Sequence, residues 1–273
     1  MKNTLRQFSL YGATLLAALL SFNAHAAGKL DQRMADATEV IHEFTQIPES
    51  AIPDSLLANA HGIAVFPGVI KIGLGIGGRY GKGVLIVRQA DGSWSNPSFV
   101  SLGGGSFGWQ IGAQSTDLML VFKDRRSINN IFNGKITLGA DAAAAAGPVG
   151  RQASAATDGH LKAAIYSYAR NRGLFAGISL DGSWLRMDRR SNQNFYGNTL
   201  SPEEILSATD LTAPLSASEF VDLMTTTAPG TDRPSTYRTA ATTDMPAETI
   251  DQNADVRIYA IEPLESDYDE TTF

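Results

Sequence analysis

Alternating glycines between His61 and Arg88 limit what this chain can fold into. The stretch reads HGIAVFPGVIKIGLGIGGRYGKGVLIVR, and the runs Ile63–Phe66 and Val84–Val87 flank a segment with glycine at nearly every second position. Val, Ile and Phe favour a pleated, half-buried surface, whereas glycine marks bends and close approaches of two backbones. We therefore expect two or three strands joined through a tightly bent, glycine-lined region.

The first 26 residues have the composition of a secretory signal peptide. Lys2 and Arg6 precede an apolar run over residues 10–22, and residues 24–26 form an A-x-A cleavage site. The run is shorter than the roughly 20 residues that a membrane-spanning helix needs. The chain contains no cysteine, so we expect neither disulfides nor a lipid-modified cysteine anchor. These features predict an exported, periplasmic protein, soluble or peripherally attached to a membrane.

Charge is distributed unevenly along the chain. Residues 27–198 carry 17 Lys and Arg against 13 Asp and Glu, a net charge of +4, and residues 199–273 carry 3 against 15, a net charge of −12. After residue 206 the composition shifts toward Thr, Ala, Pro and Asp, with little hydrophobic periodicity beyond a short helix expected over 217–224. We therefore expect a signal peptide at 1–26, a globular domain at 27–207 and an acidic, mostly disordered tail at 208–273.

Helical and strand-like patterns alternate along the globular part. Apolar residues at three- and four-residue steps over 30–44 predict an amphipathic helix with Asp31 as N-cap, and residues 55–59 predict a second, short helix. Asp124 is expected to cap a further helix, and residues 201–204 form a capping box. Strand-like segments cover 94–100, 109–122 (as two strands), 166–168, 174–180 and 183–187. The pattern predicts an α+β fold: a strongly bent, mostly antiparallel, glycine-rich sheet or partial barrel with a few packed helices.

Two nucleotide-binding patterns lie in the glycine-rich stretch. Residues 73–78 satisfy G-x-G-x-x-G, but the pattern binds a pyrophosphate only when a helix follows, and the next residues favour a strand. In the near P-loop at Gly81-Lys82, Gly83 stands where a magnesium-binding Ser or Thr is needed. His42, His61 and His160 show no metal-ligand spacing. We expect no cofactor and no metal.

A serine-hydrolase pattern is a rival interpretation. Residues 104–108 read GGSFG and satisfy G-x-S-x-G around Ser106. Acidic and basic partners follow in hydrolase order: Asp117, Asp124 or Asp141, and then His160. The hydrolase elbow requires a helix directly after the serine, however, and the residues after Ser106 favour a strand. We therefore expect Ser106 to be structural and the chain to have no catalytic residues.

Six motifs, in chain order, are similar to those of the SYLF domain family, also known as the Ysc84-type actin-binding or lipid-binding domain. They read GIAVFP, IGGRYGKGVLIVR, WSNPSFVSLGGGSFGWQIG, LGADAAAAAGPVGR, YSYARNRGLFAGISLDGS and NQNFYG, and the resemblance covers roughly residues 34–206. It implies an α+β domain without known catalysis. It also implies binding of phosphoinositide-containing membranes, as in eukaryotic members, some of which bind actin filaments. Bacterial members are exported proteins.

Basic clusters are the candidate binding residues. We expect them to attach the globular domain to anionic membrane lipid, with each cation near the membrane contributing about 1 kcal/mol. An ordinary solvated face is the alternative for these charges. Two other functions are open: an envelope adaptor whose acidic tail binds a cationic protein partner, and the serine hydrolase. No nucleic-acid partner is expected, and actin enters only by family analogy. The candidate lipid-binding residues are Arg79, Lys82, Lys123, Arg125, Arg126, Arg186, Arg189 and Arg190.

Overall fold

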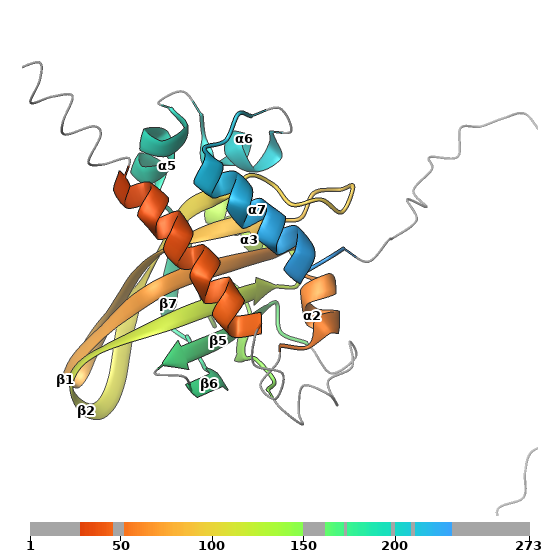
Figure 1. Ribbon diagram of the computed structural model, residues 1–273. Coiled ribbons are helices and arrows are strands. Elements are labelled where there is room, and N and C mark those ends of the chain that lie inside the picture. The colour runs from red at the N-terminus through yellow and green to blue at the C-terminus, as the bar shows by residue number, and fades with distance from the viewer. Residues whose placement is uncertain are drawn as a thin grey trace, which may run out of the picture. The chain divides into compact units, whose positions relative to one another are not determined.

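A computed structural model describes residues 28–45, 52–149, 162–171, 174–197, 200–208 and 211–230, with backbone alone at 74–76 and 106–112. It confirms the α+β class: helices pack on a curled seven-stranded sheet that forms a half-barrel (Figure 1). The predicted signal peptide and residues 231–273 lie outside the described residues, so export and a disordered tail stay predictions. In the described part of the chain no helix has the length and apolar character needed to cross a bilayer.

The elements follow one another in a simple order. An N-terminal helix spans residues 28–45. The remaining helices are α2 (Asp54–Ala58), α3 (Arg125–Phe132), α5 (Arg189–Tyr196), α6 (Pro202–Ser207) and α7 (Leu215–Thr227). The strands are β1 (Gly62–Val87), β2 (Ser98–Phe122), β3 (Lys135–Thr137), β4 (Ala144–Ala146), β5 (Ile165–Asn171), β6 (Leu174–Gly177) and β7 (Ser183–Met187).

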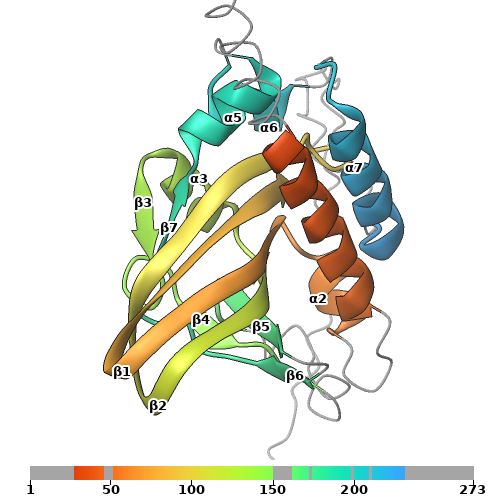
Figure 2. The same cartoon turned by 60° about the vertical axis from the view of Figure 1, so that its left-hand side comes forward.

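Strands β1 and β2 form one long antiparallel ribbon that bends in its middle. They pair from Gly62 opposite Phe122 to Leu85 opposite Ser98, with a register shift at the bend between Leu74 and Gly75. The prediction of separate strands on each side of the glycine region is therefore wrong, for β1 and for β2, because the ladder continues through the bend. In both views the bend projects away from the helices (Figures 1 and 2).

Glycine lets the two halves of β1 touch, as the sequence predicts. A Cβ atom on Gly83 would overlap the carbonyl oxygen of Val65, and one on Gly81 would lie 2.6 Å from Cγ2 of Val69. Contacts of this kind between the halves before and after the bend leave no space for any side chain. The glycine spacing is thus what allows the sheet to curl this tightly.

The two halves of β2 carry the rest of the sheet. Its first half pairs with β7, and β3 extends the sheet beyond β7. Its second half pairs with β5, which also pairs with β6. The β4–β5 pair is parallel and the other five are antiparallel, so the predicted mostly antiparallel sheet is confirmed among the described residues.

Each face of the curled sheet carries its own core. One face packs against the N-terminal helix, α2 and α7, with Met34, Ile41 and Phe44 buried as the helical periodicity predicts. The other face encloses a second cluster that includes Ile128 and Ile131 of α3. We call these the helix-covered face and the enclosed face. Asp31, predicted as an N-cap, instead lies inside the N-terminal helix and accepts a hydrogen bond from the Ser216 hydroxyl at 2.7 Å.

Helix α7 packs on the globular domain, although it lies beyond the domain end that the sequence predicts. The sequence predicts this limit at residue 207. In the structure Ala217, Phe220 and Met224 of α7 are fully buried in the core between the helices and the helix-covered face of the sheet. The indole of Trp94 donates to the carbonyl oxygens of Met224 and Ala228, at 3.1 Å each. Helix α7 and Ala228 therefore pack with the globular domain, beyond the limit expected at residue 207.

Candidate anion-binding pocket

A pocket of ≈ 340 Å³ opens between β1, β2, β7 and the end of α3, beside the start of α5. Its wall contains three cationic side chains and one carboxylate, that of Asp188. The cations, Lys82, Arg186 and Arg189, come from β1, β7 and α5. We call this site the cationic pocket. The remaining wall is formed by Tyr80, Ser101, Ile131, Phe132, Gly134 and Met187.

Strand register explains how distant residues meet in the cationic pocket. Lys82 lies opposite Ser101, Ser101 opposite Arg186, and Arg186 opposite Lys135. Directly opposite residues of antiparallel strands project from the same face. Adjacent strands are about 4.8 Å apart, so Lys82 and Arg186 start roughly 10 Å apart across Ser101. Long side chains at that separation can close around one anionic group.

An aromatic row lies one step along the strands from these cations. Tyr80, Gly103 and Trp184 are opposite one another in the ladder. A Cβ atom on Gly103 would overlap the Trp184 indole, so glycine lets the ring lie against the sheet. The Arg186 guanidinium lies 5.1 Å from the centre of the Trp184 ring, a cation–π contact between two residues of β7.

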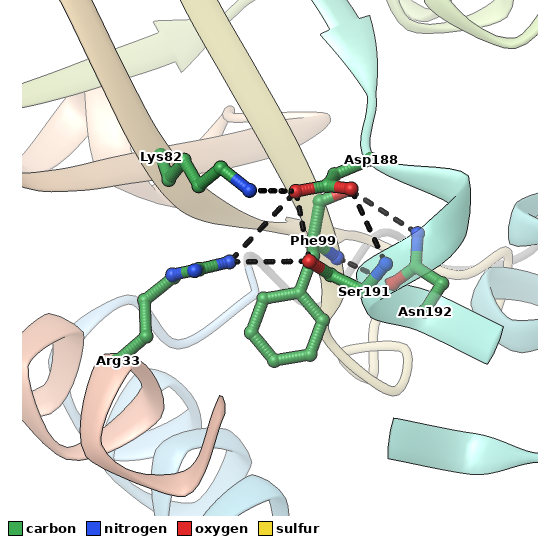
Figure 3. Close-up of polar contacts among 6 residues, drawn as sticks. All are labelled: Arg33, Lys82, Phe99, Asp188, Ser191 and Asn192. Atoms are coloured by element: carbon green, nitrogen blue, oxygen red, sulfur yellow. Dashed lines mark hydrogen bonds and ion pairs between the residues drawn. The ribbon is translucent and has the colours of Figure 1, made fainter. Parts of the chain in front are cut away.

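Asp188 sits between two cations at the pocket edge (Figure 3). Its Oδ2 accepts hydrogen bonds from Lys82 Nζ at 3.0 Å and from the Ser191 hydroxyl at 2.8 Å. Its Oδ1 accepts from the Ser191 backbone N–H at 3.2 Å, which makes Asp188 the N-cap of α5. Burial opposes ionisation of this carboxyl, but the hydrogen bonds from Lys82 and Ser191 hold its pKa below the usual value.

Arg33 joins the N-terminal helix to the same carboxylate. Its Nη1 lies 3.9 Å from Asp188 Oδ2 and donates to the Ser191 hydroxyl at 3.4 Å. Its guanidinium stacks 5.4 Å from the ring centre of Phe99 (Figure 3). Burial lowers the pKa of Arg33, and the attraction of Asp188 opposes that shift. The pocket edge is therefore continuous with the packing of the N-terminal helix.

Asn192 fixes α5 to the sheet. Its Oδ1 accepts a hydrogen bond from the Phe99 backbone N–H at 2.6 Å, and its Nδ2 donates to the Phe99 carbonyl oxygen at 3.2 Å. Asn192 is fully buried, so both bonds are shielded from water. This pairing holds Asp188 and Arg189, three or four residues earlier, at a fixed position beside β2.

Comparison with known proteins places this architecture in a family. Residues 103–227 match the family described as Ysc84, Las17-binding protein actin regulator. This chain carries a Ysc84-family domain. The match confirms the resemblance seen in the sequence motifs, and it runs through α7. Arg186 and Arg189 lie inside the matched segment of the Ysc84 domain, whereas Tyr80 and Lys82 precede it.

Relatives of the Ysc84 domain occur in animals and fungi. The chain is 34% identical over 194 residues to SH3 domain-containing YSC84-like protein 1 of Bos taurus, covering 69% of this chain and 56% of the relative. It is 35% identical over 162 residues to LAS seventeen-binding protein 3 of Saccharomyces cerevisiae, covering 58% of this chain and 35% of the relative. Each alignment therefore spans about half or less of the relative's own length.

The predicted lipid-binding residues fall into four groups in the structure. Lys82, Arg186 and Arg189 meet in the cationic pocket. Arg190 is exposed on α5 but does not line it. Arg79, an odd number of residues from Lys82 in β1, points to the enclosed face, where its Nε is buried without a hydrogen-bond partner. The remaining three, Lys123, Arg125 and Arg126, surround the start of α3, whereas the pocket contacts the end of that helix.

Sequence reasoning missed four residues of the pocket region: Arg33, Tyr80, Trp184 as a partner of Arg186, and Asp188. The pattern Asp188-x-x-Ser191 is a helix-capping signal that could have located α5. Nothing in the sequence indicates the pairing of Arg33 with Asp188, because 155 positions separate them. Such a contact depends on the fold of the Ysc84 domain.

The rival nucleotide and hydrolase patterns fall within strands of the Ysc84 domain. Residues 73–78 and Gly81-Lys82 lie inside β1, so no helix start follows either pattern. Ser106 lies inside β2, and the strand that was expected after it continues to Phe122. The helix on which a hydrolase elbow depends is therefore missing after Ser106. His160 lies outside the described residues.

Proposed function

We propose that this Ysc84 domain is a non-catalytic module that attaches to anionic lipid surfaces through the cationic pocket. The observation that carries the proposal is the convergence of Lys82, Arg186 and Arg189 from three elements on one open pocket. Guanidinium and ammonium groups recognise phosphate by charge-assisted hydrogen bonds. Lys135 continues the same row of the sheet and adds a fourth positive charge.

The expected attachment is weak and depends on salt. Each Lys or Arg near an anionic membrane contributes about 1 kcal/mol, so four cations offset by Asp188 supply about 3 kcal/mol. That corresponds to roughly a hundredfold preference for anionic over neutral membranes. Attachment of this strength is reversible, and it suits a peripheral protein.

The non-catalytic part of the proposal has two supports. Ser106, centre of the hydrolase pattern, lies in a strand. The relatives carry names of SH3-domain and Las17-binding proteins, which describe binding and not a reaction. Export to the periplasm is part of the proposal as well, and it rests on the sequence of residues 1–26 alone.

A protein-binding role is the second candidate. The family description and the yeast relative's name both refer to Las17 binding, and the family description to actin regulation. By analogy, an acidic protein segment would occupy the cationic pocket of this chain in place of a lipid headgroup. The envelope-adaptor hypothesis, in which the acidic C-terminal residues bind a cationic partner, does not involve the cationic pocket and gains no support from it.

Co-sedimentation of the full chain with vesicles tests the lipid proposal. We expect binding to vesicles of phosphatidylglycerol and phosphatidylcholine at 0.1 M salt, where the Debye length is about 10 Å, and release at 1 M, where it is about 3 Å. Vesicles of phosphatidylcholine alone are the control and should leave the protein in the supernatant. Failure to sediment with anionic vesicles at low salt would overturn the proposal and leave protein binding as the better candidate.

A further inference from the structure

Three exposed apolar side chains lie close to the bend of β1. Ile70 is 50% exposed, Ile72 60% and Tyr80 47%, although each belongs to a strand. Each lies within five residues of the bend between Leu74 and Gly75. Among the described residues the other large exposed apolar side chains are Leu174 and Leu215, on β6 and α7. Exposed apolar surface on β1 is thus concentrated at the bend.

These residues share a sheet face with Lys82 and Arg186 of the cationic pocket. Val69 is buried on the enclosed face, so its neighbour Ile70, and Ile72 with it, point to the helix-covered face. Tyr80 lies two residues from Lys82 and therefore on the same face. The bend projects beyond the N-terminal helix and α7, so these helices leave this end of the face open (Figures 1 and 2).

Along β1 the order of side chains, from cationic to aromatic to aliphatic, matches the order of layers from the headgroups of a bilayer to its hydrocarbon. Counted from Gly75 at the bend, Lys82 lies seven residues away, Tyr80 and Ile70 lie five away, and Ile72 lies three away. Each two-residue step is about 6.6 Å, and the headgroup region of one leaflet is roughly 5–8 Å thick. With the Lys82 row at the headgroups, Tyr80 falls at the interface, where aromatic side chains concentrate, and Ile72 falls in the hydrocarbon.

The bend itself is suited to an apolar medium. Residues 72–78 and 98–116 contain no charged residue, and the charges that flank the bend in β1, Lys71 and Arg79, project from the enclosed face. The β1–β2 ladder resumes on both sides of the bend, with Gly73 opposite Gly112 and Gly77 opposite Ser106, and the register shift between Leu74 and Gly75 leaves residues 109 and 110 of β2 without partners in β1. Pairing along the inner edge of the ribbon satisfies only part of its backbone groups, and an unpaired N–H or C=O group costs several kcal/mol in hydrocarbon, so the bend can enter only the outermost part of the acyl-chain region.

We propose that the bend of the β1–β2 ribbon inserts into the acyl-chain region of an anionic bilayer while the cationic pocket holds the headgroups. The occupant is a bilayer because the apolar end of the face adjoins a row of cations, an arrangement that matches headgroups above acyl chains. This inference rests on the proposed lipid function and adds the orientation of the domain and the element that enters the membrane.

A single fluorescent probe tests the insertion. The chain has no cysteine, so Ile72→Cys in the full chain gives one labelling site for an environment-sensitive nitrobenzoxadiazole probe. With phosphatidylglycerol vesicles we expect a blue shift, a severalfold rise in emission, and quenching by lipid brominated in its acyl chains. Leu174→Cys, 78% exposed on β6, is the matched control and should show none of these changes.

A charge substitution gives a second measurement. Ile70→Asp with Ile72→Asp removes two exposed side chains, so the folded state should persist, and vesicle binding should fall at least tenfold. If wild type sediments with anionic vesicles while the probe at position 72 stays in water, insertion is wrong and the lipid function stands. If wild type does not sediment, the lipid function fails, and insertion with it.

Discussion

Asp188 controls the charge of the cationic pocket at the scale of single residues. It is the one carboxylate among the described residues that line the pocket, and it accepts a hydrogen bond from Lys82. An anion that binds Lys82 must therefore compete with a carboxylate already in place. The same group caps α5, so one residue both shapes and weakens the site.

Replacing Asp188 separates these two roles. Asp188→Asn keeps an N-cap side chain but removes the negative charge, so we expect binding to anionic vesicles to strengthen about fivefold. Vesicle titration measures this change. Asp124→Asn, which alters the cap of α3 in the same way outside the pocket, should leave binding unchanged. Weaker binding by Asp188→Asn would show that the carboxylate contributes to the site.

The difference in stability between wild type and Asp188→Asn should depend on pH. Because the folded state lowers the pKa of Asp188, its ionised form stabilises the fold above the unfolded pKa of about 3.9. That contribution disappears as pH falls through the lower folded pKa. Lys82 is partly exposed, so the difference near neutral pH is at most about 1 kcal/mol. Melting curves of wild type and variant should differ at pH 7 and converge well below pH 4.

Glycine at position 83 is a second residue on which the fold depends. Gly83→Ala places a Cβ atom against the Val65 carbonyl oxygen and the Phe66 ring, so we expect a loss of about 3 kcal/mol in unfolding free energy. Gly105→Ala is the matched control, since nothing lies within 4 Å of the added atom. Denaturant titration of both variants gives the comparison. Equal stability would mean that the two halves of β1 separate without cost.

At the scale of elements, α7 shows where sequence reasoning stopped short. Its helical pattern over 217–224 was visible, but its place in the globular domain was not. The contacts that dock it come from Trp94 and Arg88, more than 130 positions away: Arg88 Nη2 donates to the Ala228 carbonyl oxygen at 2.9 Å. The bend of the ribbon shows the converse. Glycine spacing predicted close backbone approach, but periodicity alone could not reveal that pairing continues through it.

Truncation distinguishes the two domain limits. Ending the chain at residue 207 removes α7 and exposes the surface that Phe220 and Met224 cover. Loss of such buried side chains costs about 3–5 kcal/mol each, comparable with the whole stability of a domain. We expect that variant to be unfolded or aggregated, and a chain ending at 230 to keep the wild-type melting temperature. A stable, soluble chain ending at 207 would contradict this assignment.

At the scale of the whole molecule, charge asymmetry is the main feature outside the pocket. Residues 231–273 contain 3 Arg against 10 Asp and Glu, a net charge of −7. This charge opposes approach to an anionic surface. Removing residues 231–273 should therefore strengthen binding to anionic vesicles at low salt, with a smaller effect at high salt and none on neutral vesicles. Unchanged binding at low salt would exclude this restraint.

The fold class, the family, and the absence of a helix after the nucleotide and hydrolase patterns were predictable from sequence, because each depends on local patterns. The site was predictable only in part. Three of eight predicted cations meet in the pocket, and strand register decides which: Lys82 and Arg186 share a row, whereas Arg79 projects from the opposite face. Register sums pairing along whole strands and cannot be derived from the composition of a cluster.

Paired charge reversals on anionic vesicles test the central claim most directly. Arg186→Glu with Arg189→Glu changes two exposed residues of the cationic pocket, and Arg125→Glu with Arg126→Glu makes the same change in net charge at the start of α3. We predict that the pocket pair abolishes measurable binding at 0.1 M salt, whereas the α3 pair lowers it only a few fold, both with melting temperatures near wild type. Equal losses from the two pairs would contradict the pocket and indicate attraction by net charge alone.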